Sequence, residues 1–549
     1  MKWNKRYMGI LMSIMMTSSL LTGCGGASMS KDTGFVAREN MVEATEEPAP
    51  EAMDQSTTAM GPTYEEEGIY TDEEQYTQKR ITGQGEPNSE SYSELIENDF
   101  MNTKENEVST FSIDVDTASY ANVRRFINQG TLPVADAVRI EELINYFNYD
   151  YPNPKGDVPF SITEEMMPCP WNEAHQLLLV GLKGKTLLPE EIPPSNLVFL
   201  IDVSGSMNEE NKLPLLKESF SILTSNLKAS DTVSIVVYAG SSGVVLDGAE
   251  GNDERAIKDA FRRLAAGGST AGAEGIERAY QLAESHFIEG GNNRVIIATD
   301  GDFNVGPSSL EELEAIITKK AKKGIFLTTL GFGMGNYKDD MMETLADKGN
   351  GNYAYIDSLD EAQKVLGEEM YGTLYAIAKD VKIQVEFNPS KVESYRLIGY
   401  ENRVLAKEDF DNDAVDAGEI GAGHHVTALY EIQTVDANRE EKQNYYEDTD
   451  ILKGEEYGLV KLRYKEPDEE ESKLLFCMFK PQKNENNSNI GFASAVAEYG
   501  MLLRDSKYKK DASYDNVLKR VATYMGDDPY KQEFMDMVYE TKKLTKNLD

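Results

Sequence analysis

The fold of this 549-residue chain is decided by one short stretch, residues 197–206, which reads LVFLIDVSGS. Five consecutive apolar residues are typical of a β-strand that is buried on both faces of a parallel sheet. An aspartate and two serines follow at alternate positions, Asp202, Ser204 and Ser206. Such polar residues at the end of a buried strand indicate a loop at the carboxyl edge of an α/β sheet, where these folds bind their ligands.

Alternating strands and helices continue on the C-terminal side of this stretch. We expect further buried strands at residues 233–238, 295–298, 325–330 and 353–356. Helical spacing predicts helices between and after them, at residues 213–227, 253–264, 272–287, 308–322, 339–345 and 359–376. Strands that alternate with helices predict a doubly wound, mostly parallel α/β sheet with helices on both faces, over residues 191–377.

Two other segments place polar residues at the same edge of this sheet. Gly267-Gly268-Ser269-Thr270 opens one predicted helix, and Thr299-Asp300-Gly301 follows a predicted strand. Together with the first loop they supply hydroxyl and carboxylate oxygens, which suit Mg²⁺, Mn²⁺ or Ca²⁺ rather than zinc. Because few of these groups are charged, a bound metal keeps positive charge and an open position, whose natural occupant is a carboxylate of another molecule.

This set of residues resembles the metal-ion-dependent adhesion site (MIDAS) of von Willebrand factor A domains, over about residues 193–377. Asp202, Ser204 and Ser206 match the Asp-x-Ser-x-Ser motif, Thr270 matches the family's threonine, and Asp300 matches its later aspartate. The resemblance implies a Rossmann-like fold. It also implies that the serines and the threonine contact the metal directly, and the aspartates directly or through water.

Two segments outside this region resemble a group of bacterial lipoproteins that carry such a domain. Residues 112–120 (SIDVDTASY) resemble the region before the domain, and residues 418–424 (GEIGAGH) resemble the region after it. With these flanks the resemblance covers about residues 107–545. The group's biochemical role is poorly defined, so the resemblance implies an architecture more than a function.

Alternating apolar residues on both sides of the α/β region predict an antiparallel β-sandwich as a second domain. The candidate strands lie at residues 176–182, 381–387, 426–432, 459–464 and 474–479. The sandwich takes strands from an N-terminal flanking region, 106–190, and from residues 378–485, with the α/β domain inserted between them. We also expect helices at 120–129 and 135–147 of the flank, and C-terminal helices over 486–549.

Residues 1–23 predict a signal peptide. Lys2, Lys5 and Arg6 precede an apolar run over residues 8–21 that is too short for a good membrane span. Leu21-Thr22-Gly23-Cys24 looks like a bacterial lipobox, whose cysteine carries fatty acyl chains such as palmitate. The alternative is a secretory signal with a chance cysteine. We expect Cys24 to anchor the mature chain on the extracytoplasmic face of the cell membrane.

The formal net charge of −40 excludes non-specific nucleic-acid binding, because a polyanion repels an acidic protein. Residues 24–105 are acidic and have no apolar period, which predicts a disordered tether. A cation-collecting or partner-binding tail is the alternative. After processing, Cys169 and Cys477 remain besides Cys24, and a disulfide and two free thiols are both open.

The sequence favours a binding protein over an enzyme. It contains no Gly-x-Ser-x-Gly elbow, no His-Glu-x-x-His helix and no phosphate-binding loop of the Gly-x-x-x-x-Gly-Lys type. The main hypothesis is a surface lipoprotein whose MIDAS binds a Glu or Asp carboxylate of a protein ligand through Mg²⁺, Mn²⁺ or Ca²⁺. A structural or assembly subunit of an envelope complex is the alternative, and a metal-dependent hydrolase is a third, less favoured reading.

Overall fold

The computed structural model describes residues 89–547, apart from residues 157, 189, 240, 269–271, 302–309, 436–454, 468 and 481–486. The chain divides into two units, residues 1–81 and 82–549, and every described residue belongs to the second. The predicted signal peptide, Cys24 and residues 24–88 of the predicted tether therefore lie outside the described residues.

An α/β domain holds one six-stranded sheet with the order β10-β9-β8-β5-β6-β7. Its strands are β5 (Ser195–Asp202), β6 (Thr232–Tyr238), β7 (Ser242–Glu250), β8 (Asn292–Thr299), β9 (Ile325–Phe332) and β10 (Tyr353–Ile356). Neighbouring strands from β10 to β6 are parallel, and the edge strand β7 runs antiparallel to β6. The expected doubly wound, mostly parallel sheet is confirmed.

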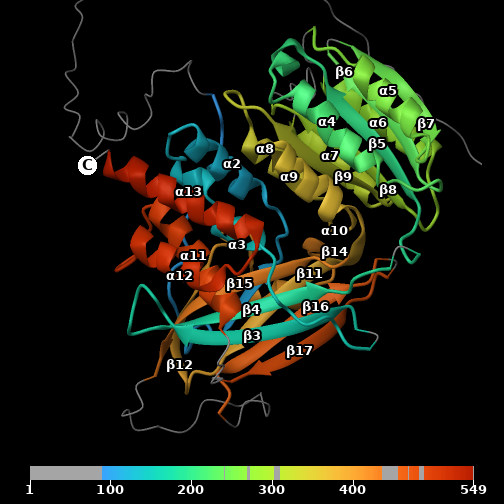
Figure 1. Cartoon of the computed structure of the whole chain (residues 1–549). Coiled ribbons are helices and arrows are strands. Elements are labelled where there is room, and N and C mark those ends of the chain that lie inside the picture. Colours follow the sequence, from blue (N-terminus) through green and yellow to red (C-terminus); the bar gives the residue numbers. More distant parts are fainter. Residues whose placement is uncertain are drawn as a thin grey trace, which may run out of the picture. The chain divides into compact units, whose positions relative to one another are not determined.

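Helices cover both faces of this sheet (Figure 1). They are α4 (Leu213–Thr224), α5 (Glu254–Arg263), α6 (Gly272–Ser285), α7 (Leu310–Ala321), α8 (Asp339–Lys348), α9 (Leu359–Gln363) and α10 (Met370–Leu374). Leu197, Phe199 and Ile201 pack in one cluster with α4 and α5, whereas Val198 and Leu200 pack in another with α6 and α7. Successive side chains of a strand point to opposite faces, which is why the whole run in β5 is apolar.

A β-sandwich forms the second domain. One sheet has the order β1-β12-β15-β4-β3 and the other β13-β2-β11-β16-β17, with β14 paired to β11. The strands are β1 (Met101–Asn102), β2 (Val108–Ser112), β3 (Phe160–Pro168), β4 (Gln176–Gly184), β11 (Ala376–Phe387), β12 (Val392–Ile398), β13 (Val404–Leu405), β14 (Gly418–Gly421), β15 (His425–Thr434), β16 (Gly458–Lys465) and β17 (Lys473–Phe479). An apolar core of residues from both sheets fills the space between them.

The chain leaves the sandwich after β4, forms the α/β domain, and returns as β11. Both crossing points are bound to one turn. The Gly423 N–H donates to the Lys185 carbonyl at 3.0 Å, and the Ala422 N–H donates to the Tyr375 carbonyl at 2.9 Å. The ends of the inserted domain therefore lie close together, on either side of this turn.

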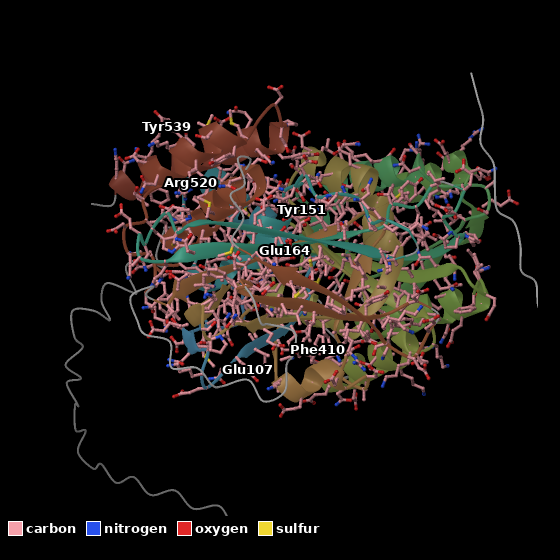
Figure 2. All side chains as sticks on the ribbon, turned by 90° about the horizontal axis from the view of Figure 1, so that it is seen from below. Glu107, Tyr151, Glu164, Phe410, Arg520 and Tyr539 are labelled. Carbon is pink, nitrogen blue, oxygen red and sulfur yellow. The ribbon has the colours of Figure 1, made fainter. Side chains whose placement is uncertain are left out.

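Helices pack against the outer face of the β4 sheet (Figure 1). They are α2 (Ala118–Asn128), α3 (Ile140–Asn145), α11 (Ser488–Leu503), α12 (Tyr514–Tyr524) and α13 (Pro529–Lys546). In Figure 2, Glu164 lies on the teal strand β3, and Arg520 and Tyr539 lie on the red helices α12 and α13. Arg520 pairs with Glu498, a buried carboxylate of α11, and so ties two of these helices together.

The predicted helix at residues 135–147 is wrong as a single element. A 3-10 turn (Ala135–Ala137) ends at Val138, and Arg139 takes an extended conformation before α3 begins at Ile140. At this break the buried Arg139 guanidinium contacts Asp339 of the α/β domain at 2.5 Å.

The boundary of the predicted tether at residue 105 lies too far along the chain. A strap, residues 89–102, is bound to the folded unit: the Ser91 N–H donates to the Tyr337 carbonyl at 3.0 Å, and β1 pairs with β12. Glu90 pairs with the buried Arg125 at 2.9 Å, and the Asn98 side chain donates to the Gly399 carbonyl at 2.8 Å. Polar side chains attach this segment, so apolar periodicity does not reveal it.

Arginines of the flanking region and of the sandwich form ion pairs with the α/β domain. Arg124 of α2 contacts Asp357 at 2.5 Å and Glu361 at 2.7 Å, where α9 begins. Arg403, which follows β12, contacts Asp347 of α8 at 2.6 Å. The described part of the inserted domain is therefore fixed by ion pairs as well as by its covalent ends.

Candidate functional site

The carboxyl ends of β5 and β8 bring two aspartates to one edge of the sheet. Asp202 is the last residue of β5, and Asp300 directly follows Thr299, the last residue of the neighbouring parallel strand β8. Both aspartates have an exposed fraction of 0%. Two buried carboxylates therefore lie at this edge of the sheet.

Hydrogen bonds fix the Asp202 carboxylate beneath the loop that follows it. Its Oδ1 accepts from the Ser204 backbone N–H at 2.8 Å, and the Thr299 hydroxyl donates to its Oδ2 at 3.1 Å. The hydroxyl oxygens of Ser204 and Ser206 lie 2.9 Å apart. Ser204 is buried and Ser206 is exposed, so the oxygen cluster runs from the buried carboxylate to the surface.

Thr270, the threonine of the predicted site, lies outside the described residues. The segment just before it is attached to the Asp202 loop at two points. The Gly267 N–H donates to the Val203 carbonyl at 2.7 Å, and the Gly205 N–H donates to the Gly268 carbonyl at 3.2 Å. Among the described residues, the structure thus brings together Asp202, Ser204, Ser206 and Asp300.

Asp300 has a partner that sequence reasoning missed. The ammonium of Lys212 lies 3.0 Å from the Asp300 Oδ2, and both side chains are almost fully buried. Lys212 is near the motif in sequence, but its partner lies 88 residues further along the chain. Gly301, which follows Asp300, has φ +88, and a Cβ there would lie 2.6 Å from the Lys338 backbone nitrogen.

The pKa of Asp202 shows that its ionised form is disfavoured in the metal-free site. Burial, together with the nearby Asp300 carboxylate, raises the pKa of Asp202 to about 6, although the hydrogen bonds from Ser204 and Thr299 act in the opposite direction. A positive ion placed against these oxygens would favour the ionised form. Carboxylate and hydroxyl oxygens are the ligands that Mg²⁺ and Ca²⁺ prefer, so this donor set fits a hard divalent cation.

In the described residues, no group of three or more His, Cys, Asp or Glu side chains is placed to hold a metal ion. The candidate edge has two carboxylates, those of Asp202 and Asp300, and its other oxygen donors are hydroxyls. Cys24 lies outside the described part of the chain. Cys169 and Cys477 are free thiols, and the Cys477 thiol donates to Glu164 at 2.6 Å.

Comparison with protein families accounts for most of the chain. A profile described as von Willebrand factor type A domain matches residues 196–368, and one described as von Willebrand factor matches residues 86–179. A third profile, described as the C-terminal part of the uncharacterized protein YfbK, matches residues 372–544. In chain order, the three matches cover the flank with its sandwich strands, then the α/β domain, and then the remaining sandwich strands with the C-terminal helices.

Whole sequences give the same picture. The chain is 44% identical to the uncharacterized protein YfbK of Escherichia coli K12 over 467 residues, which are 82% of this chain and 81% of YfbK. It is 28% identical to the inter-alpha-trypsin inhibitor heavy chain H3 of Mesocricetus auratus over 180 residues, 30% of this chain and 19% of that protein. A similar solved structure, a von Willebrand factor type A protein from Catenulispora acidiphila, is 15% identical, covers 70% of this chain and 91% of its own, and has a TM-score of 0.39.

None of the described helices is both long enough and apolar enough to cross a bilayer.

Proposed function

Because the chain belongs to the bacterial proteins with a von Willebrand factor type A domain that include YfbK, we propose that it binds a protein ligand through a divalent metal. The domain's edge would hold Mg²⁺, or Mn²⁺ or Ca²⁺, with Asp202, Ser204, Ser206, Thr270 and Asp300. The ligand would present a Glu or Asp carboxylate. Von Willebrand factor A domains are typically protein-interaction modules, and their relatives are typically not enzymes.

One observation carries the proposal: a buried carboxylate and two hydroxyls are stacked toward the surface at the sheet edge. Asp202 is fully buried, and Ser206, whose hydroxyl lies 2.9 Å from that of Ser204, is exposed. Hydrogen bonds offset the cost of burying the carboxylate, and the exposed Ser206 extends the row of oxygens to the surface. The same arrangement suits a cation that is held from below and approached from outside.

The residues of the site have two roles: some would supply negative charge that holds the ion, and others would supply neutral oxygen atoms that leave the ion positively charged. Asp202 supplies negative charge, and Thr299 and the Ser204 backbone N–H keep its carboxylate in place. The neutral hydroxyls of Ser204 and Ser206 supply oxygen atoms without further charge. When bound, the metal supplies a positively charged, incompletely coordinated site that attracts a carboxylate from another protein.

Calorimetric titration of the chain with Mg²⁺ tests the metal site. Asp202→Ala should lower Mg²⁺ affinity about tenfold or more, because a neutral site attracts a dication far less than a carboxylate does. Asp247→Ala is the matched control, since Asp247 is an exposed carboxylate of the same domain that pairs with His286. Equal Mg²⁺ affinity of the wild type and Asp202→Ala would place any bound metal elsewhere.

Capture from solubilised envelopes separates binding of an external ligand from an assembly role. Immobilised chain is exposed to envelope proteins with Mg²⁺ or with EDTA, and the bound proteins are identified by mass spectrometry. Capture that EDTA and Asp202→Ala both abolish supports recognition of a carboxylate through the metal. A partner that stays bound in EDTA supports the alternative, a structural subunit of an envelope complex.

The proposal includes a lipid anchor at Cys24 on the extracytoplasmic face of the cell membrane. Its support is the sequence alone, the charged and apolar segments followed by Leu21-Thr22-Gly23-Cys24. Two or three acyl chains suffice for stable anchoring. Cys24→Ala should release the mature chain from membranes or leave the uncleaved precursor, and a processed variant that still fractionates with membranes would contradict the anchor.

A further inference from the structure

Lys212 forms a buried ion pair inside the candidate metal site. Its Nζ lies 3.0 Å from the Asp300 Oδ2, and the two side chains are 4% and 0% exposed. A lysine is rarely buried to this extent without a charged partner, because removal of an ammonium from water costs several kcal/mol. The pair is therefore part of the buried structure of the sheet edge, and not a chance contact of a surface lysine.

The backbone around Lys212 aims its side chain into the site. Lys212 directly precedes α4, where its carbonyl accepts from the Leu216 N–H at 2.8 Å and its own N–H donates to the Glu209 carbonyl at 3.1 Å. The aliphatic stem runs against Gly333, the residue after β9, and a Cβ at Gly333 would overlap that stem. Gly333 has φ +78, a conformation that glycine adopts without strain. The turn before α4 thus fixes the backbone of Lys212, and Gly333 leaves space for its aliphatic stem.

We propose that Lys212 is an internal counter-ion of the metal site, which weakens metal binding and leaves the bound metal more positive; this rests on the proposed function. Asp202 and Asp300 contribute two negative charges, and Lys212 cancels one of them. A dication bound there then gives a site with net positive charge, whereas the same site without the lysine would be neutral. The net positive site that contains Lys212 attracts an incoming carboxylate more strongly than the neutral site without the lysine would.

The same charge lets the domain fold before any metal binds. Without Lys212, the two buried carboxylates at the ends of adjacent strands would lose a cation that offsets their mutual repulsion. With Lys212 in place, the metal is needed to bind the ligand and is not needed for the domain to fold. The metal-free chain should accordingly be stable in EDTA.

Lys212→Met tests this role, because methionine fills most of the space of the stem and removes the charge together with the hydrogen bond to Asp300. Mg²⁺ affinity, measured by calorimetry, should rise about tenfold or more, since the repulsion between ammonium and dication is lost. The unfolding temperature in EDTA should fall, and the rise that Mg²⁺ produces should be larger than in the wild type. Lys217→Met is the matched control: Lys217 lies on α4, and its ammonium donates to the Leu264 carbonyl, outside the metal site.

The possible outcomes separate the inference from the proposed function. A Lys212→Met variant that loses stability but binds Mg²⁺ with wild-type affinity would show a purely structural ion pair and overturn the inference alone. A wild type that binds no Mg²⁺ would overturn the proposed function and the inference with it. If Lys212→Met does not fold, Lys212→Gln keeps a donor for Asp300 while removing the charge, and the same tightening is expected.

Discussion

Glu141 is a buried carboxylate whose ionised form the structure does not stabilise. It is 0% exposed, and neither of its side-chain oxygens has a hydrogen-bond partner among the described residues. Burial, with further contributions from Glu401 and Asp114, raises its pKa to about 8. The folded chain therefore keeps a proton on Glu141 at neutral pH that the unfolded chain releases.

Stability should fall as the pH rises through this range. Between the unfolded pKa of about 4.5 and the folded pKa of about 8, the folded state binds more protons, so the free energy of unfolding decreases by up to ~1.4 kcal/mol per pH unit. Glu141→Gln removes this term and should be more stable than the wild type at pH 8 but not at pH 4.5. Urea unfolding at both pH values measures it, and an unchanged pH slope in the variant would contradict the assignment to Glu141.

The candidate site shows which functional residues a sequence can reveal. Asp202, Ser204 and Ser206 could be predicted because they stand at alternate positions of one short loop that directly follows an unbroken apolar run. Lys212 could not, since lysine before a helix is common and its partner Asp300 is 88 residues away. The positions of strand ends also predict Thr270 and Asp300 from two other loops, but no sequence pattern indicates which distant charged side chain pairs with Asp300.

At the level of elements, Arg124 of α2 links α9 to the flanking helices. Its guanidinium is 5% exposed and contacts Asp357 and Glu361, which are 7% and 1% exposed. Arg124→Met should lower the free energy of unfolding by about 3–5 kcal/mol, because it leaves two carboxylates buried without their cation. Arg255→Met is the control, because Arg255 is 92% exposed and its ion pair with Asp259 is long, at 3.8 Å. Equal losses of stability in the two variants would contradict this reading.

The strap gives a second prediction at this level. A chain that begins at Val108 lacks Glu90 and leaves Arg125 without that carboxylate, and it also uncovers the edge of β12. We expect its free energy of unfolding to be lower, by about 3 kcal/mol at least, than that of a chain that begins at Ser89. Urea unfolding of the two chains measures the difference, and equal midpoints would mean that the strap lies on the fold without stabilising it.

Elements differ in how far the sequence predicts them. The buried parallel strands could be predicted because both of their faces are covered, which leaves an unbroken apolar run. The edge strand β7 contains no buried residue, so nothing in its sequence distinguishes it from a loop. Arg139, which lies in the break between Ala137 and Ile140, pairs with a residue 200 positions later, and no local pattern contains such a contact.

At the level of the whole described unit, the α/β domain is an insertion whose two ends meet. Ala376, the first residue of β11, pairs with Gly421, and Lys185 accepts from Gly423 on the same turn. Among the described residues, the core between the two sheets and the core between the β4 sheet and its helices contain no residue of the inserted domain, which packs against α2 in a separate, smaller cluster. A short linker in place of residues 186–375 should therefore close the sandwich with little strain, because loop closure between adjacent ends costs little entropy.

This deletion variant should fold cooperatively, with less helix but an intact near-ultraviolet spectrum from its buried aromatic residues. Arg124 loses Asp357 and Glu361, but it gains contact with water, so no charge is left buried without a partner. The reciprocal chain, residues 191–377, keeps both apolar clusters on its sheet but exposes Tyr353 and Tyr355, which pack against α2 in the intact unit. It should therefore fold with a lower unfolding temperature and bind more of a hydrophobic dye than the intact chain. A deletion variant without a cooperative transition would show instead that the sandwich needs the inserted domain in order to fold.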